Sequence, residues 1–139
     1  MNNAATVAAS LLVGTLIALG ATACAPRTVA DARYGGLPEG FEREFLPGEE
    51  QLIAVEVDGS LAVVTWGSSS CLPTAVEFSV SGERADVVFD PPREDVCTAD
   101  LGPTTHVFNA STVGPRVPSE VAVTFEDDGS THVVDVVRD

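Results

Sequence analysis

The chain of 139 residues contains no lysine and only seven arginines, against 21 aspartates and glutamates. Its formal net charge is -14 at pH 7. An acidic balance of this size repels phosphate backbones, so we expect no nucleic-acid partner. Aromatic residues are also scarce, at 6%, whereas 45% of the residues are hydrophobic. The composition therefore predicts one small acidic globular domain with an aliphatic core.

The first charged side chain is that of Arg27, so the beginning of the chain carries no charged side chain. Residues 7–19 form an apolar run that is shorter than the roughly 20 residues a membrane-spanning helix needs. Three small residues, Ala21, Thr22 and Ala23, follow it, and small residues are what a signal peptidase accepts before its cleavage site. Residues 1–23 are therefore predicted to be a signal peptide.

The segment Ala21-Thr22-Ala23-Cys24 resembles the lipobox of bacterial lipoproteins, although Ala21 stands where the family usually has leucine. The resemblance implies that the sulfur of Cys24 carries diacylglycerol and that Cys24 begins the mature chain. The protein would then be extracytoplasmic, anchored to the outer face of the cytoplasmic membrane. Two alternatives stay open. One is a secreted protein cleaved near Ala23 with Cys24 as a free thiol, and the other is an uncleaved anchor.

The chain has three cysteines, Cys24, Cys71 and Cys97. Lipidation of Cys24 would leave an even pair, and in an oxidising compartment Cys71 and Cys97 are then expected to form a disulfide. A zinc site is disfavoured, because two cysteines and the scattered His106 and His132 lack ligand spacing. We expect no metal and no cofactor.

Residues 24–50 are rich in proline, glycine and charge and show no sustained periodicity. They are predicted to be the lipidated N-terminus and a flexible linker. A flexible chain of this length spans about 25–30 Å, enough to hold a domain away from a membrane. One short helical turn is expected near residues 41–45.

From residue 51 onward, apolar and polar residues alternate with a period of two. Three two-residue turns, Asp58-Gly59, Gly82-Glu83 and Asp128-Gly129, interrupt the alternation at positions typical of β-hairpins. The strands that they join are expected at 52–57 and 60–66, at 74–81 and 84–90, and at 121–127 and 130–137.

Each turn also predicts a register that gathers apolar side chains on one face and leaves each hairpin half-buried. Val57 is expected opposite Ser60 in the first hairpin. Val76 is expected opposite Phe89 in the second, and Phe125 opposite His132 in the third. The apolar sets are Ile53, Val55, Val57, Ala62, Val64 and Trp66; Val76, Phe78, Val80, Ala85, Val87 and Phe89; and Val121, Val123, Phe125, Val134 and Val136.

A seventh strand is expected at 104–109, and no convincing helical pattern occurs. Seven short strands predict an all-β domain over residues 51–139, a two-sheet antiparallel sandwich of immunoglobulin-like character. The order of the strands stays open.

Function is expected in two loops, 67–73 and 91–103, which the predicted disulfide would join at one end of the domain. The candidate binding residues there are Ser68, Ser69, Ser70 and Asp100. The runs VVTWGSSSC at 63–71, CTAD at 97–100 and GPTT at 102–105 resemble a group of small exported actinobacterial lipoproteins. This resemblance implies a location and no chemistry.

The serine run lacks the G-x-S-x-G pattern of hydrolases, and only His106 or His132 could act as its base. His132 is expected to be a partly buried packing residue. The acidic run at 126–129 lacks the ligand spacing of a calcium loop, and the cluster of Glu94, Asp95 and Asp100 near Cys97 is a slightly better calcium candidate. We therefore expect no enzyme but a lipoprotein with a binding or structural role, whose partner would be an envelope protein or a glycan.

The alternative is a small secreted enzyme or enzyme inhibitor that uses the Cys71/Cys97 loop end. As an enzyme, it would need His106 within hydrogen-bond reach of the serine run.

Overall fold

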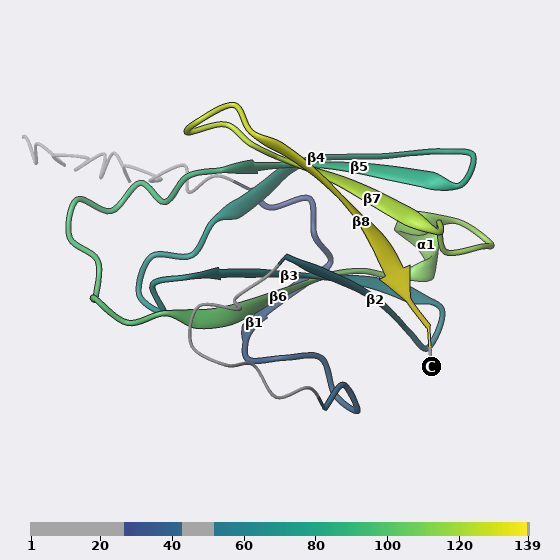
Figure 1. Ribbon diagram of the computed structural model, residues 1–139, viewed down its shortest axis with the longest axis horizontal. Coiled ribbons are helices and arrows are strands. Elements are labelled where there is room, and N and C mark those ends of the chain that lie inside the picture. The colour runs from purple at the N-terminus through teal and green to yellow at the C-terminus, as the bar shows by residue number, and fades with distance from the viewer. Residues whose placement is uncertain (1–26, 43–51, 139) are drawn as a thin grey trace, which may run out of the picture.

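The computed structural model describes residues 27–42 and 52–138. Within these residues lie eight strands and one short helix (Figure 1). The domain is therefore all-β, as the alternation predicted. Among the described residues, no helix has the length and apolar character needed to cross a membrane.

The first hairpin has the predicted register. Strands β2 (Ile53–Val57) and β3 (Ser60–Gly67) pair antiparallel, with Val57 opposite Ser60. Asp58 and Gly59 between them have φ angles of 50° and 74°. A type I′ turn needs two positive φ angles, which aspartate and glycine adopt more readily than most residues.

The second hairpin has the predicted bounds, β4 (Thr74–Ser81) and β5 (Arg84–Asp90), and the predicted register near its turn. A β-bulge between Ala75 and Glu77 then shifts the pairing. Ala75 rather than Val76 lies opposite Phe89, so this part of the prediction was wrong. Alternation could not reveal the bulge, because Ala75 and Val76 are both apolar.

The third hairpin forms between β7 (Glu120–Phe125) and β8 (Thr131–Val137), with a register two residues away from the predicted one. Val123, not Phe125, lies opposite His132. Residues 126–129 form a wider loop, in which the N–H of Gly129 donates to the carbonyl of Phe125 at 2.9 Å. Because the shift is even, the same side chains still share the inner face.

Strand β6 (Gly102–Phe108) matches the seventh predicted strand to within two residues. It is followed by α1 (Ala110–Val113), a single turn that the sequence did not predict. Asn109 caps this turn, because its side-chain oxygen accepts from the backbone N–H groups of Ser111 and Thr112.

The described part of the expected linker differs from the prediction. It contains β1 (Ala32–Gly35), which pairs antiparallel with β6, and Ala30 lies in the core. All of β1 is exposed, so its sequence shows no alternation that could have predicted a strand. The helical turn expected near 41–45 falls largely outside the described residues.

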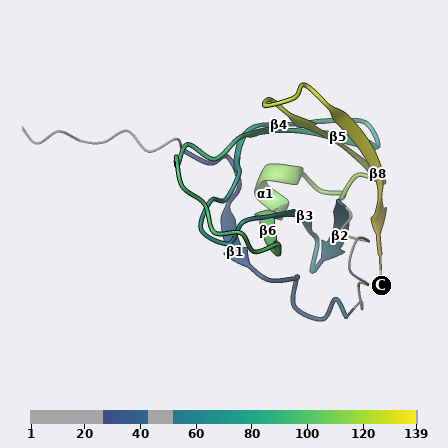
Figure 2. The same cartoon turned by 60° about the vertical axis from the view of Figure 1, so that its left-hand side comes forward.

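The strands form one sheet in the order β1-β6-β3-β2-β8-β7-β5-β4. The sheet curls so that its two halves face each other, with β8 passing from one half to the other (Figures 1 and 2). Two pairs, β2 with β8 and β5 with β7, are parallel. The expected two-sheet sandwich of antiparallel strands is therefore not confirmed.

The main core lies between the two halves of the curled sheet. Its buried residues include Leu61, Val63, Phe89, Phe108 and Val123. The first hairpin is not half-buried, as was predicted, but buried on both faces. Its predicted apolar face forms a second small core, in which Ile53, Val55 and Val64 pack with Leu37, Phe41 and Val57.

The two edges of the curled sheet meet where the chain enters the domain. The N–H of Val29 donates to the carbonyl of Ala75 at 2.8 Å, and Asp31 N–H donates to the carbonyl of Val107. Arg33 on edge strand β1 donates to the carbonyl of Pro73 at 3.0 Å, beside edge strand β4. We call this contact between the two edges the seam.

Candidate functional site

The predicted disulfide is present. Cys71 and Cys97 are joined, with their Cα atoms 5.5 Å apart and a sequence separation of 26. The bond connects the 67–73 loop to the 91–103 loop at one end of the domain. A disulfide is consistent with an extracytoplasmic location, because such bonds persist in oxidising compartments.

Hydroxyl groups and one carboxylate connect the same two loops. Ser68 Oγ lies 2.8 Å from Thr98 Oγ1, and the N–H of Thr98 donates to Ser70 Oγ at 2.9 Å. Asp100 accepts a hydrogen bond from the N–H of Ser69 at 3.3 Å and another from the hydroxyl of Thr98. The structure thus brings together the candidate residues Ser68, Ser69, Ser70 and Asp100, and they bond across the two loops.

The surroundings keep Asp100 ionised. Hydrogen bonds from Ser69 and then from Thr98 lower the pKa of its carboxyl group to about 2, because these donors favour the carboxylate. Thr98 was not singled out as a candidate, although it lies in the CTAD run beside Cys97. Together these contacts hold the long loop against the short one.

The structure does not bring His106 to the serine run. His106 on β6 is fully buried, and its Nε2 lies 3.1 Å from Thr65 Oγ1, whereas the serines bond to the 91–103 loop. Burial lowers the pKa of His106 to about 3, with a smaller contribution from the nearby charge of Arg33. The pairing of His106 with a serine that the enzyme alternative required is therefore not formed.

His132 is exposed, so its prediction as a partly buried residue was wrong. It lies edge-on to Phe125, with ring centroids 6.2 Å apart, and contacts Ser130 Oγ at 3.2 Å. His132 keeps its place on the inner face, opposite Val123, but it lines an open groove, described next, and its ring is exposed there.

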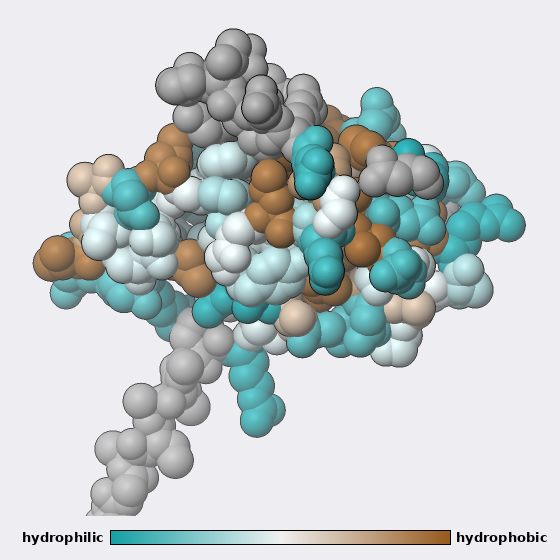
Figure 3. All heavy atoms as spheres, turned by 90° about the horizontal axis from the view of Figure 1, so that it is seen from below, coloured by the Kyte–Doolittle hydropathy of each residue, from teal (hydrophilic) through white to brown (hydrophobic). Residues whose placement is uncertain are grey.

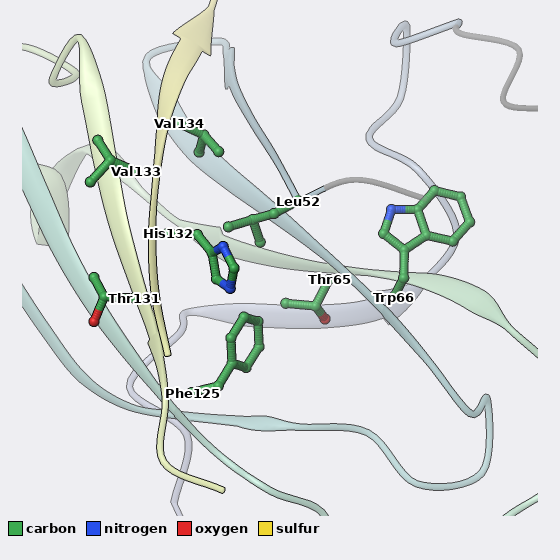
Figure 4. A pocket seen from close by; sticks show the side chains of 8 residues that line it. All are labelled: Leu52, Thr65, Trp66, Phe125, Thr131, His132, Val133 and Val134. Carbon is green, nitrogen blue, oxygen red and sulfur yellow. The ribbon is translucent and has the colours of Figure 1, made fainter. Parts of the chain in front are cut away.

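An open groove of about 660 Å³ lies between β3 and β8. It exists because β2 pairs with β8 only at Val136 and Val137, so the two halves of the sheet diverge before that point. In Figure 4, the side chains of Thr65, Phe125 and His132 point into this space. The residues that line the groove are Leu52, Thr65, Trp66, Phe125, Thr131, His132, Val133 and Val134.

The lining combines aliphatic and aromatic surface with hydroxyl and imidazole groups. Such a mixture suits an uncharged ligand with both apolar and hydroxyl groups. A smaller pocket of about 210 Å³ shares Thr65, Trp66 and Phe125 with the groove and reaches the disulfide. Sequence reasoning missed the groove, because it depends on where two strands separate.

The acidic run at 126–129 acts as a turn. The N–H of Ser130 donates to Asp128 Oδ1 at 2.8 Å. Hydrogen bonds from the Ser130 side chain and then from its backbone lower the pKa of Asp128. Within residues 27–42 and 52–138, no three potential metal-ligating side chains come together. Cys24 and the predicted signal peptide lie outside the described residues.

Comparison with protein-family models, curated proteins and solved structures finds no match for this chain.

Proposed function

We propose that this protein is a lipoprotein anchored through Cys24 to the outer face of the cytoplasmic membrane, where its β-domain has a binding or structural role. The cysteine count carries the proposal. Cys71 and Cys97 are bonded to each other, which leaves Cys24 as the one remaining cysteine of the sequence. It follows Ala21-Thr22-Ala23, the segment that resembles a lipobox.

The binding role belongs to the groove between β3 and β8, beside the disulfide-bridged end. Its mixture of aromatic, aliphatic and hydroxyl groups fits an envelope protein or a glycan as partner. In this proposal the curled sheet works as an immunoglobulin-like sandwich does, with two facing halves that hold a site at one end.

The intact mass of the protein, purified from its native membranes and alkylated without reduction, tests the anchor. We expect residues 24–139 plus a diacylglyceryl group, with two hydrogens missing and no alkyl label. A lipid-free mass with one alkylated thiol would contradict the proposal, because Cys24 would then be a free thiol in a secreted protein.

A pair of variants tests the same point in cells. Cys24→Ala should leave the membrane fraction or remain unprocessed. The matched control, Cys71→Ser with Cys97→Ser, removes the other two cysteines and should stay in the membrane fraction. Membrane association of Cys24→Ala equal to that of the control would contradict the proposal.

A further inference from the structure

The chain between the proposed anchor and the folded domain is short. Val29 is already bonded to Ala75 at the seam, and Ala30 is only 7% exposed. Five residue steps separate Val29 from Cys24, and they span at most about 17 Å when fully extended. An anchor on Cys24 therefore holds the surface around Val29 close to the bilayer. This distance is shorter than the span of about 25–30 Å that was expected for a flexible linker over residues 24–50.

The surface around Val29 is continuous with the disulfide-bridged end. Ala75 follows Cys71 by four residues, and Cys71 is bonded to Cys97 in the 91–103 loop. In Figure 2, the purple start of the described chain and this green loop both lie toward the left-hand side. A membrane near Val29 is therefore within reach of the loop.

The loop carries the two most exposed large hydrophobic side chains of the described residues. Val96 is 86% exposed and Leu101 is 57% exposed, one on each side of Cys97. Figure 3 shows brown hydrophobic atoms at the left-hand end, where the loop projects in Figure 1. The disulfide and the Thr98 hydrogen bonds already hold the loop, so little ordering entropy opposes its insertion into an interface.

Charge at this end is mixed. Arg27, Arg33 and Arg93 are three of the seven arginines in the chain, but Glu94 and Asp95 lie beside Val96, and the ionised Asp100 lies beside Leu101. Attraction to anionic headgroups is therefore weak, and the short chain and the apolar side chains are what favour contact with lipid.

We propose that the disulfide-bridged end of the domain rests on the membrane surface, with Val96 and Leu101 inserted among the lipid headgroups. This inference rests on the proposed lipidation of Cys24. The bonds among Ser68, Ser70, Thr98 and Asp100 then serve to present the two apolar side chains.

Photolabelling from within the bilayer tests the inference on the purified, processed protein. The protein is placed in vesicles of phosphatidylcholine and phosphatidylglycerol that contain a carbene-generating lipid, and is then reduced and cut with trypsin. Trypsin cuts after arginine, so peptide 94–116 holds Val96 and Leu101. Peptide 117–138 is the internal control, because it holds Val133 and Val137, which are 54% and 40% exposed.

We expect several-fold more label on 94–116 than on 117–138. Equal or reversed labelling, or no label on either peptide, would overturn the inference. The N-terminal peptide 24–27 separates the two proposals, because its diacylglyceryl group reports the anchor independently. A peptide without lipid would overturn both.

A double variant shows which side chains touch lipid. V96D with L101D should lose most of the label on 94–116, whereas V133D, at a comparably exposed site, should keep it. All three positions are exposed, so the fold is expected to survive, and circular dichroism checks this. Undiminished label on 94–116 in the double variant would count against insertion of Val96 and Leu101.

Discussion

Thr65 Oγ1 and His106 Nε2 lie 3.1 Å apart inside the domain, and both residues are buried. The other ring nitrogen of His106, Nδ1, has no hydrogen-bond partner among the described residues, and the ring packs edge-on against Phe89. His106 is thus a neutral core residue, and its protonation would place an uncompensated charge in an apolar interior.

The stability of the domain should fall as the pH falls below about 6.5. The pKa of His106 drops from 6.5 to about 3 on folding, so the unfolded chain binds more protons between these values. The free energy of unfolding then decreases with decreasing pH, by up to about 1.4 kcal/mol for each pH unit. Urea unfolding between about pH 8 and about pH 5 measures the effect, which should be absent above pH 7.

The two histidines of the chain provide the control. His132→Ala should keep this pH dependence, because His132 is exposed. His106→Gln should lose it, whatever its own stability. An unchanged slope in His106→Gln would show that another group is responsible.

Removal of the disulfide should destabilise the domain by about 3–4 kcal/mol, because the unfolded chain loses its cross-link over a loop of this length. Cys71→Ser, compared with the wild-type protein by urea unfolding, measures the loss. Cys24→Ser is the matched control and should leave the stability unchanged. A reductant should destabilise the control but not Cys71→Ser, and equal sensitivity of the two proteins would refute the prediction.

Loss of the Arg33 guanidinium should loosen the seam. Arg33 Nη1 donates to the carbonyl of Pro73 and lies 3.4 Å from Thr74 Oγ1, so it ties the two sheet edges together. In Arg33→Met the amide of Val29 should exchange its hydrogen faster, while the amide of Val123 on central strand β7 should not change.

Arg116→Met is the control for that experiment. The Arg116 side chain is 83% exposed and forms an ion pair with Glu83 at 3.8 Å. Glu83 lies in the turn between β4 and β5, at the opposite end of β4 from the seam residue Thr74. Nuclear magnetic resonance measures the exchange rate of the Val29 amide in both variants. Equal acceleration in Arg33→Met and Arg116→Met would rule out a specific role for Arg33.

Truncation of Phe108 should be among the costliest core substitutions. Its ring is fully buried and stacks on Phe78 from the opposite half of the sheet, with centroids 4.2 Å apart. Phe108→Ala should lower the free energy of unfolding by about 3–5 kcal/mol. Val133→Ala, at an exposed site, is the control and should change the free energy of unfolding by less than about 0.5 kcal/mol. A loss in Phe108→Ala as small as the loss in Val133→Ala would contradict a core shared by the two halves of the sheet.

Local patterns predicted most of the strands. Alternation and the Asp58-Gly59 turn were enough for the first hairpin, because a type I′ turn sets the register directly. The pair of loop cysteines was likewise enough for the disulfide. Where a turn allows more than one geometry, as at Asp128-Gly129, the predicted register was two residues off.

Features that depend on distant partners could not be predicted in this way. Strand β1 has no buried residue of its own, so only its pairing with β6 defines it as a strand. The Val76 error has the same origin, since the bulge that places Ala75 opposite Phe89 is seen only in the paired strands.

The sequence likewise predicted some features of the candidate site and not others. The serines and Asp100 were found from their place beside the cysteines, but the sequence could not show that they bond across the two loops. The groove was not visible at all, because it exists only where β8 leaves β2.

The sequence by itself determined seven of the eight described strands, two of the hairpin turns and the cysteine pair, because each depends on residues close together in the chain or on chemistry that only cysteine has. Only the tertiary structure decided the strand order, the parallel pairs, the seam at Val29 and Arg33 and the groove. These features arise because the two halves of the sheet bury a common core. That packing brings together residues that are far apart in the sequence, and a local sequence pattern cannot show which distant residues will meet.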